Sequence, residues 1–284
     1  MARLIALTTL TMVAFAANSL LNRAALIDGG TGPAAFAALR VASGAVCLVL
    51  LVTIRRGFPK IGGDARVIGA GSLCVYILGF SFAYVALDAG IGALILFGMV
   101  QLTMFTGALL SGDRPGRARW IGAVVALLGL AWLVSPSAAT APDPAAAFLM
   151  ALAGFGWGIY SLVGRRAADP LEETAANFIC AAPVALLVWL VWADGITVSG
   201  ALLAVLSGAV TSGLGYALWY SILPRLDASI AALAQLTVPV IAVAGGVILL
   251  SEPVTLRLLL ASAVILGGVA LGVLGQRRIG SKGS

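Results

Sequence analysis

The chain has 284 residues, of which 61% are hydrophobic and 10% are charged, and its mean hydropathy is +1.10. Soluble domains carry about 25% charged residues and transmembrane barrels alternate polar with apolar residues, so the composition and the long apolar runs exclude both, as well as a disordered or fibrous chain. The net charge of +6 comes from residues in short loops beside apolar segments, and this placement argues against nucleic-acid binding.

Ten apolar runs of about 20 residues follow one another, each long enough to cross a bilayer. They lie near 4–27, 32–54, 67–87, 90–111, 118–135, 145–164, 173–193, 199–223, 228–250 and 254–275. The fold predicted is therefore an all-α integral membrane protein with ten transmembrane helices. Ala14-Phe-Ala16 resembles a signal-peptide cleavage site, but the apolar run continues through Leu20 and Leu21, which favours a first membrane helix.

The basic residues predict the orientation of the spans. With the N-terminus inside, 14 of the 17 Lys and Arg residues fall on the inner side, whereas Arg23 and Arg257 lie outside and Arg40 lies within a span. Because Lys and Arg are enriched in cytoplasmic loops, both termini are expected in the cytoplasm. This pattern predicts a multi-pass protein of the cytoplasmic (inner) membrane with an even number of spans.

The two halves of the chain are related in sequence. Leu87-Asp-Ala-Gly-Ile-Gly-Ala-Leu94 matches Leu226-Asp-Ala-Ser-Ile-Ala-Ala-Leu233, and this alignment gives 11 identities in the 44 positions from Asp88 to Ala131. Residues 1–140 and 141–279 are predicted as two five-helix repeats, with 280–284 as a tail. Because five is odd, the second repeat must cross the membrane in the opposite sense. Inverted repeats of this kind permit alternating access.

The chain resembles the drug/metabolite transporter superfamily at the Leu-Asp-Ala turns of both halves and at the acidic residues that follow, Asp113 and Glu252. Within that superfamily it is similar to the EamA-type exporters, and most similar to the YddG group, which exports aromatic and other amino acids. The resemblance covers nearly the whole chain and implies ten spans and transport. It is less specific for substrate, because the superfamily also carries sugars, nucleotide sugars, drugs and phosphorylated metabolites.

Polar and aromatic residues inside the spans form stripes at helical spacing, and polar groups in lipid are expected to face the interior of the bundle. The substrate-binding candidates are Asn18, Asn22, Tyr76, Phe80, Tyr84, Gln101, Trp157, Tyr160, Ser161, Thr211, Gln235 and Arg40. Such residues also join helices or mark the interfacial belt, where Trp120, Trp189 and Trp192 are expected. Tyr76, Trp157, Tyr160 and Gln235 lie deeper and predict a cavity walled by aromatic rings and neutral hydrogen-bonding groups.

Arg40 is the one charged residue well inside a predicted span, about 10 Å along the helix from Pro33. It could anchor a substrate carboxylate, snorkel outward, or bond carbonyl groups at a helix end, and a structural role is favoured. All 11 acidic residues lie at span ends or in loops. Asp88 and Asp227 are expected to cap the helices that follow them, and Glu252 to mark a helix start.

The leading hypothesis is a transporter that exports amino acids, including aromatic and neutral ones. The alternative within transport is an exporter of another small metabolite or an uncharged drug. An enzyme is disfavoured because the chain has no histidine, no carboxylate within a span and no HExxH sequence. The expected partners are a small-molecule substrate and membrane lipid; no cofactor, metal, nucleic acid or protein partner is expected.

Overall fold

The computed structural model describes residues 2–63, 66–112, 115–135, 141–165, 167–226 and 228–280. These residues form helices joined by short loops, with no strand among them, and ten helical segments are long and apolar enough to cross a membrane. The all-helical fold with ten candidate spans agrees with the prediction, and most helix ends fall within a few residues of the predicted boundaries.

The first half contains α1 (Ala2–Leu26), α2 (Pro33–Arg56), α3 (Arg66–Ala83), α4 (Ala89–Leu110) and α5 (Arg117–Val134). The second half begins with α6 (Pro144–Gly164) and α7 (Pro170–Trp192). Its eighth span is continuous through α8 (Val198–Val205), the π-helix η1 (Leu206–Leu214), α9 (Gly215–Ile222) and the 3-10 turn η2 (Leu223–Arg225). Then follow α10 (Ala228–Gln235), α11 (Thr237–Leu250) and α12 (Leu256–Gly280).

Local sequence explains where several helices begin and where one is interrupted. Proline stands at the first turn of α2, α6 and α7, where its missing N–H costs nothing. Asp143 caps α6 by accepting a hydrogen bond from the Ala146 amide at 2.8 Å. The ninth span is interrupted at Leu236, because Pro239 cannot donate to the carbonyl four residues earlier, that of Gln235.

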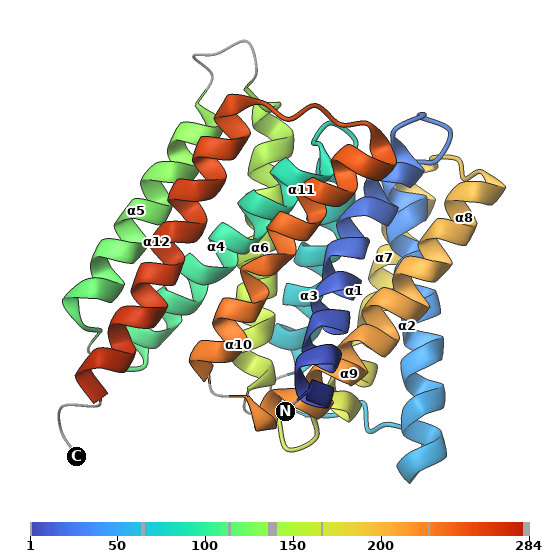
Figure 1. Cartoon of the computed structure of the whole chain (residues 1–284). Helices are drawn as coiled ribbons and strands as arrows, with labels where there is room; N and C mark the ends of the chain where they lie inside the picture. The colour runs from blue at the N-terminus through green and yellow to red at the C-terminus, as the bar shows by residue number, and fades with distance from the viewer. Residues whose placement is uncertain are drawn as a thin grey trace.

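The helices pack in pairs that correspond between the halves. Helix α5 packs against α12, α2 against α7, and α4 against α11. Helix α3 packs against α6, and the span formed by α8, η1 and α9 packs against α1 in the equivalent way. Figure 1 shows α5 and α12 side by side at one edge of the bundle and α2 with α8 at the other. This pattern is compatible with two related halves, and the division into repeats stays a prediction.

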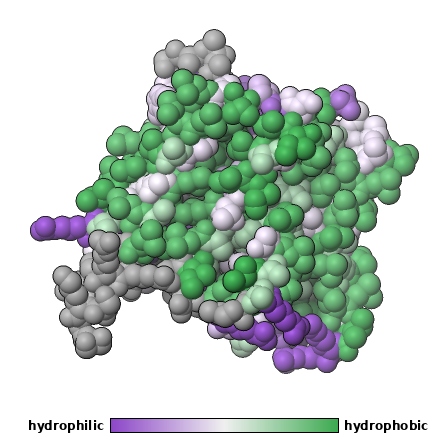
Figure 2. All heavy atoms as spheres, in the orientation of Figure 1, coloured by the Kyte–Doolittle hydropathy of each residue, from purple (hydrophilic) through white to green (hydrophobic). Residues whose placement is uncertain are grey.

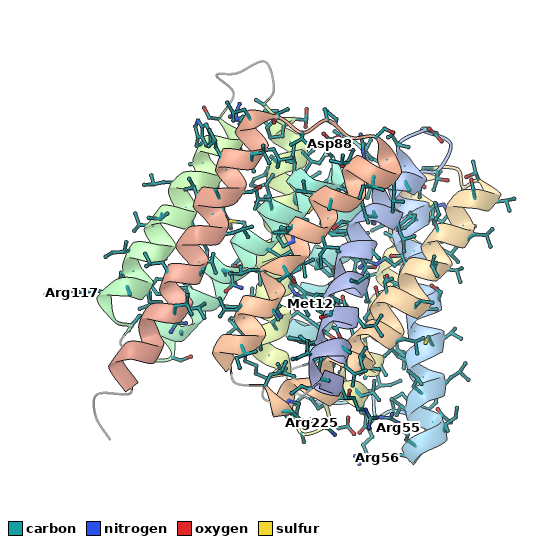
Figure 3. The ribbon with its side chains drawn as sticks, in the orientation of Figure 1. Met12, Arg55, Arg56, Asp88, Arg117 and Arg225 are labelled. Atoms are coloured by element: carbon teal, nitrogen blue, oxygen red, sulfur yellow. The ribbon has the colours of Figure 1, made fainter. Side chains whose placement is uncertain are left out.

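The surface has a broad apolar band with charged residues at its margins. Figure 2 shows green, hydrophobic residues over most of this face, with purple residues gathered along its lower edge. Arg55, Arg56, Arg117 and Arg225 lie at the lower ends of their helices, and Asp88 lies at the opposite face (Figure 3). Trp120 and Trp192 are exposed near helix ends, as expected of residues in the interfacial belt.

Candidate functional site

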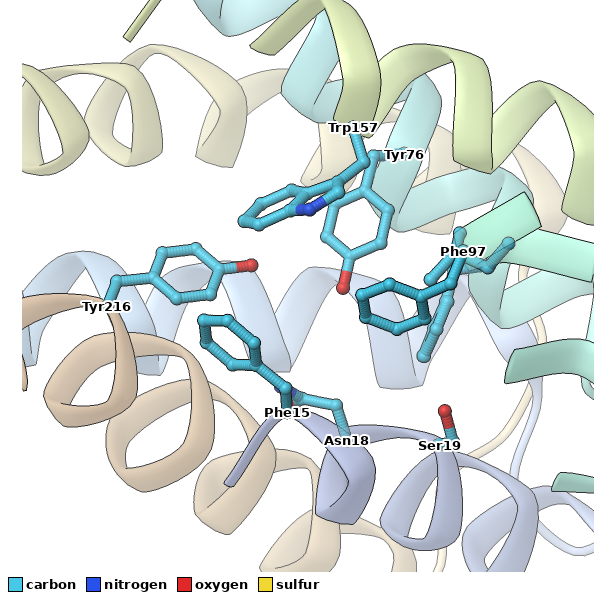
Figure 4. A pocket seen from close by; sticks show the side chains of 9 residues that line it. Phe15, Asn18, Ser19, Tyr76, Phe97, Trp157 and Tyr216 are labelled. Atoms are coloured by element: carbon cyan, nitrogen blue, oxygen red, sulfur yellow. The ribbon is translucent and has the colours of Figure 1, made fainter. Parts of the chain in front are cut away.

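A small cavity lies inside the bundle, between α1, α3, α4, α6 and α9. Figure 4 shows its wall, which consists of Phe15, Asn18, Ser19, Tyr76, Phe80, Leu96, Phe97, Trp157 and Tyr216. Both halves of the chain contribute, because Trp157 and Tyr216 come from the second. The free volume is ≈ 10 Å³, which is about the space that one water molecule needs. A molecule larger than water therefore fits this space only after the helices have moved apart.

Aromatic rings form most of the wall, and Trp157 is at their centre. Its ring centroid lies 4.9 Å from that of Tyr76, 5.1 Å from that of Tyr216 and 6.4 Å from that of Phe15. Glycines let α6 approach its neighbours, since a Cβ at Gly156 would meet the Ser72 carbonyl oxygen at 2.7 Å. Phe15 meets Trp157 edge to face, whereas Tyr76 and Tyr216 are tilted against it, and such ring contacts hold the side chains of the wall in place.

Asn18 links α1 to η1 beside the cavity. Its side-chain oxygen accepts hydrogen bonds from the hydroxyl groups of Ser207, Thr211 and Ser212. In an α-helix the positions i and i+4 share a face, and the wider i→i+5 turn of a π-helix brings the fifth residue onto that face as well. The π-helix therefore makes it possible for all three hydroxyl groups to reach one amide oxygen.

Arg40 is fully buried on α2 next to this cluster. Its Nη2 donates to the Tyr76 hydroxyl at 3.0 Å, and Nε and Nη2 both donate to Ser212 Oγ at 3.3 Å. The guanidinium carbon lies 4.9 Å from the ring centroid of Phe80 and 5.4 Å from that of Tyr76, within the range of cation–π attraction. Two of the expected alternatives for Arg40 are wrong, because its side chain is fully buried and none of its hydrogen bonds to described residues goes to a carbonyl group.

Three buried polar atoms at or near the cavity have no hydrogen-bond partner among the described residues. They are Arg40 Nη1, the Tyr216 hydroxyl and Asn22 Oδ1. Figure 4 shows the hydroxyl groups of Tyr76 and Tyr216 directed into the same central space. Buried polar groups are normally paired, and exceptions call for an explanation.

The other candidates lie at different distances from the wall. Tyr160 stacks behind Trp157 and bonds Thr174, and Ser161 donates to the Trp157 carbonyl of its own helix. Asn22 donates to Ser81, and the Tyr84 hydroxyl donates to the Ala89 carbonyl. Gln101 and Gln235 are half-buried and are not part of the wall. Of the predicted set, only Asn18, Tyr76, Phe80 and Trp157 line the cavity directly, while Arg40 and Thr211 bond residues of this cluster.

Five wall residues are not among the predicted ones: Phe15, Ser19, Leu96, Phe97 and Tyr216. Phe15 and Tyr216 share helical stripes with Asn18 and Ser212 and could have been included on that basis. Ser19 follows Asn18 directly in the chain. Leu96 and Phe97 carry no sequence signal that separates them from ordinary packing residues.

At the face that holds Asp88, carboxylates of the second half cap helices of the first half. Both Glu252 oxygens accept from the Ala89 amide, at 2.8 and 3.0 Å, and Asp194 accepts from the amides of Ala34 and Ala35 at 2.9 Å. The expectation that the Asp88 side chain caps α4 is wrong, since it makes no capping hydrogen bond. Glu252 does not begin a helix, because α12 starts at Leu256.

Arg23 joins this network through backbone and side-chain contacts. Its Nη1 donates to the carbonyls of Tyr84 and Val85, its Nη2 lies 3.6 Å from Asp88, and its Nε lies 3.7 Å from Glu252. The equivalent positions predicted in the other repeat, Asp113 and Asp227, lie outside the described residues.

Comparison with known proteins identifies the family. A model described as the EamA-like transporter family matches residues 144–274. An uncharacterized protein of Pseudomonas aeruginosa is 48% identical over 273 residues, which cover 95% of this chain and 94% of that protein. The chain belongs to the EamA-like transporter family. It is therefore a multi-pass membrane protein that acts on a small molecule as a transporter and not as an enzyme.

More distant relatives carry functional names of their own. An "uncharacterized transporter" of Archaeoglobus fulgidus is 26% identical, covering 85% of this chain and 88% of that protein. A "probable amino-acid metabolite efflux pump" of Salmonella typhimurium is 27% identical, covering 70% of this chain and 73% of that protein. A crystal structure at 22% identity matches 96% of this chain and 98% of that chain with a TM-score of 0.71, which supports the fold alone.

Proposed function

We propose that this transporter exports amino acids, including aromatic and neutral ones, from the cytoplasm by alternating access. The observation that carries the proposal is the central cavity, where Tyr76, Trp157 and Tyr216 surround a space bordered by the neutral polar groups of Asn18 and Ser19. Rings of this kind stack on flat or apolar side chains, and amide and hydroxyl groups bond amino and carboxyl groups. The name of the Salmonella relative agrees with this substrate class.

The transport mechanism we propose uses the two predicted inverted repeats, residues 1–140 and 141–279. Repeats related by an axis in the membrane plane can rock to expose a shared central site to one side and then the other. The corresponding helix pairs of the two halves and the mixed origin of the cavity wall support this mechanism. The closed cavity then represents a state in which neither side has access.

The basic face is proposed to be cytoplasmic, which places both termini inside the cell and the protein in the inner membrane. Arg56 lies at this face and Asp28 at the opposite one, and both are exposed. In a variant without the native cysteines, Asp28→Cys should react with an impermeant maleimide in intact cells and Arg56→Cys only after lysis. The opposite labelling pattern would refute this orientation.

Flux into proteoliposomes tests the substrate. Reconstituted protein should take up labelled phenylalanine and neutral amino acids, and overexpressing cells should resist toxic analogues of them. Trp157→Ala removes the central ring of the wall and should reduce flux at least tenfold, whereas Trp120→Ala removes an exposed ring at a helix end and should leave flux near wild type. The alternative, an exporter of another small metabolite or an uncharged drug, is favoured if those compounds move and no amino acid does.

A further inference from the structure

The core of this protein holds a cation that no described acidic residue neutralises. Arg40 is 0% exposed and makes no ion pair among the described residues. Every acidic residue in the described part of the chain lies in a loop or in the first turn of a helix. An unpaired charge within a membrane protein is expensive, and it usually marks a path or site for a charged ligand.

The contacts that Arg40 makes leave part of its hydrogen-bonding capacity unused. Ser212 accepts from Nε and Nη2 and Tyr76 accepts from Nη2, while Nη1 has no hydrogen-bond partner among the described residues. Tyr216 is 2% exposed, and its hydroxyl is likewise unpaired and directed into the cavity. Arg40 does not itself line the cavity, but it lies directly behind the wall, because Tyr76, which accepts from its Nη2, and Tyr216 are both wall residues. The Nη1 N–H groups and the Tyr216 hydroxyl can both donate. Their missing partner is a buried acceptor, best an anionic one.

We infer that the cavity selects its substrate by the carboxylate group, which Arg40 Nη1 and the Tyr216 hydroxyl bind while the aromatic wall holds an apolar side chain. This inference rests on the proposed function insofar as the cavity is the transport site. The substrate class is apolar monocarboxylate anions, amino acids among them. The α-amino group is dispensable, because no described carboxylate borders the cavity to pair with it. The positive charge of Arg40 repels a compound that has the same aromatic ring and an amino group but no carboxylate, such as an amino-acid amide.

Three probes with one aromatic ring separate the determinants. Phenylalanine carries both charged groups, 3-phenylpropionate only the carboxylate, and phenylalaninamide only the amine. Purified protein in detergent should be stabilised against heat by phenylalanine and by 3-phenylpropionate, and phenylalaninamide should require at least a tenfold higher concentration for the same shift. Equal protection by the amide, or no protection by either carboxylate, would overturn the inference.

Two variants and a matched control test the residues. Tyr216→Phe removes a hydroxyl group that has no hydrogen-bond partner among the described residues, so it should melt close to wild type and bind both carboxylates several-fold more weakly. Arg40→Met removes an uncompensated charge together with the hydrogen bonds to Tyr76 and Ser212, and the folded variant should lose the tenfold preference for carboxylate over amide. Tyr220 lies one turn further along the same span, outside the wall. The control variant Tyr220→Phe should therefore behave like wild type.

The outcomes distinguish this inference from amino-acid export. If 3-phenylpropionate binds and is transported while phenylalanine does neither, carboxylate selection holds and amino-acid export fails. If phenylalanine and its amide bind and move equally well in wild type and in Arg40→Met, export holds and carboxylate selection fails. Should Arg40→Met lower the melting temperature while the preference for carboxylate persists, Arg40 has a packing role and the assignment is refuted.

Discussion

Replacing Glu252 by alanine should destabilise the protein more than replacing Asp88, although Asp88 occupies the N-cap position of α4. The Glu252 carboxylate bonds the Ala89 amide with both oxygens, and its side chain is only 7% exposed. It comes from the loop between α11 and α12, so its removal unties the start of α4 from the second half. Asp88 contributes only an ion pair at 3.6 Å to Arg23, with 30% of its side chain exposed.

The magnitude follows from these contacts. A hydrogen bond to a charged group contributes about 1.5–3 kcal/mol, and loss of an N-cap costs about 0.5–2 kcal/mol. Glu252→Ala should therefore lower the free energy of unfolding by about 1–3 kcal/mol. Asp88→Ala removes only a partly exposed ion pair, for which about 0–1 kcal/mol is typical. Glu252→Gln keeps a neutral acceptor for the Ala89 amide and should fall between wild type and Glu252→Ala.

Thermal unfolding of the purified variants in one detergent measures this order. The expected melting temperatures decrease from wild type through Glu252→Gln to Glu252→Ala, with Asp88→Ala close to wild type. If Asp88→Ala proved more harmful than Glu252→Ala, the assignment of the α4 cap to the second half would be wrong.

Two further predictions concern the contact between α2 and η1 and the ionisation of Glu252. A Cβ at Gly208 would overlap the Arg40 carbonyl oxygen, so Gly208→Ala should destabilise the protein by about 1–3 kcal/mol. Thermal unfolding measures this loss against the control Gly267→Ala, whose added Cβ would have no described atom within 4 Å. Burial raises the pKa of the Glu252 carboxyl, opposed by the Ala89 amide and Arg23. The folded state therefore binds this proton more tightly than the unfolded chain does, and the Glu252 contribution to stability falls as pH rises through the raised pKa. Relative to Glu252→Gln, wild type should therefore lose melting temperature as the pH rises through the raised pKa and regain it on acidification toward the ordinary carboxyl range, and a change in the opposite direction would contradict the shift.

The number of spans could be predicted from the sequence because each span is a continuous apolar run between charged loops. The boundary of α6, predicted at 145 and found at Pro144, is marked by a proline that ends the preceding loop. The positions of loop carboxylates could not be predicted in the same way. A residue such as Asp88 next to a helix start is a local signal, whereas the approach of Glu252 depends on how α11 and α12 pack against α4.

The candidate site shows the same division between local and tertiary information. The stripe on α1 led to Asn18, since its spacing alone indicates an inward face. The π-helix, which brings Ser207, Thr211 and Ser212 together on Asn18, departs from that spacing and has no local signature in the sequence. Gln101 and Gln235 stand out in the sequence by their polarity within apolar spans, but polarity does not say which side of a helix faces the cavity.

Close backbone packing holds the crossing of α2 and η1, whereas polar contacts hold the two ends of the bundle. The end contacts are largely hydrogen bonds and ion pairs, such as Arg66 with Glu173 and Glu252 with Ala89, and water can replace them when the ends separate. At the crossing, Gly44 and Gly208 let the two backbones approach closely, and a gap there would lose close packing without any solvent substitute. We therefore expect the crossing to stay closed as a pivot during transport.

A crosslink at this crossing tests the idea. A Cβ at Gly213 would lie 3.0 Å from the sulfur and 3.2 Å from the Cβ of Cys47 on α2, close to the separation that a disulfide needs. Gly213→Cys, in a chain whose Cys74 and Cys180 are replaced by alanine, should therefore crosslink to Cys47 on oxidation. If the crossing is a pivot, oxidised and reduced protein should transport at similar rates. Flux that disappears on oxidation and returns on reduction would show that α2 and η1 must separate, and it would place the moving interface at the crossing that carries Arg40.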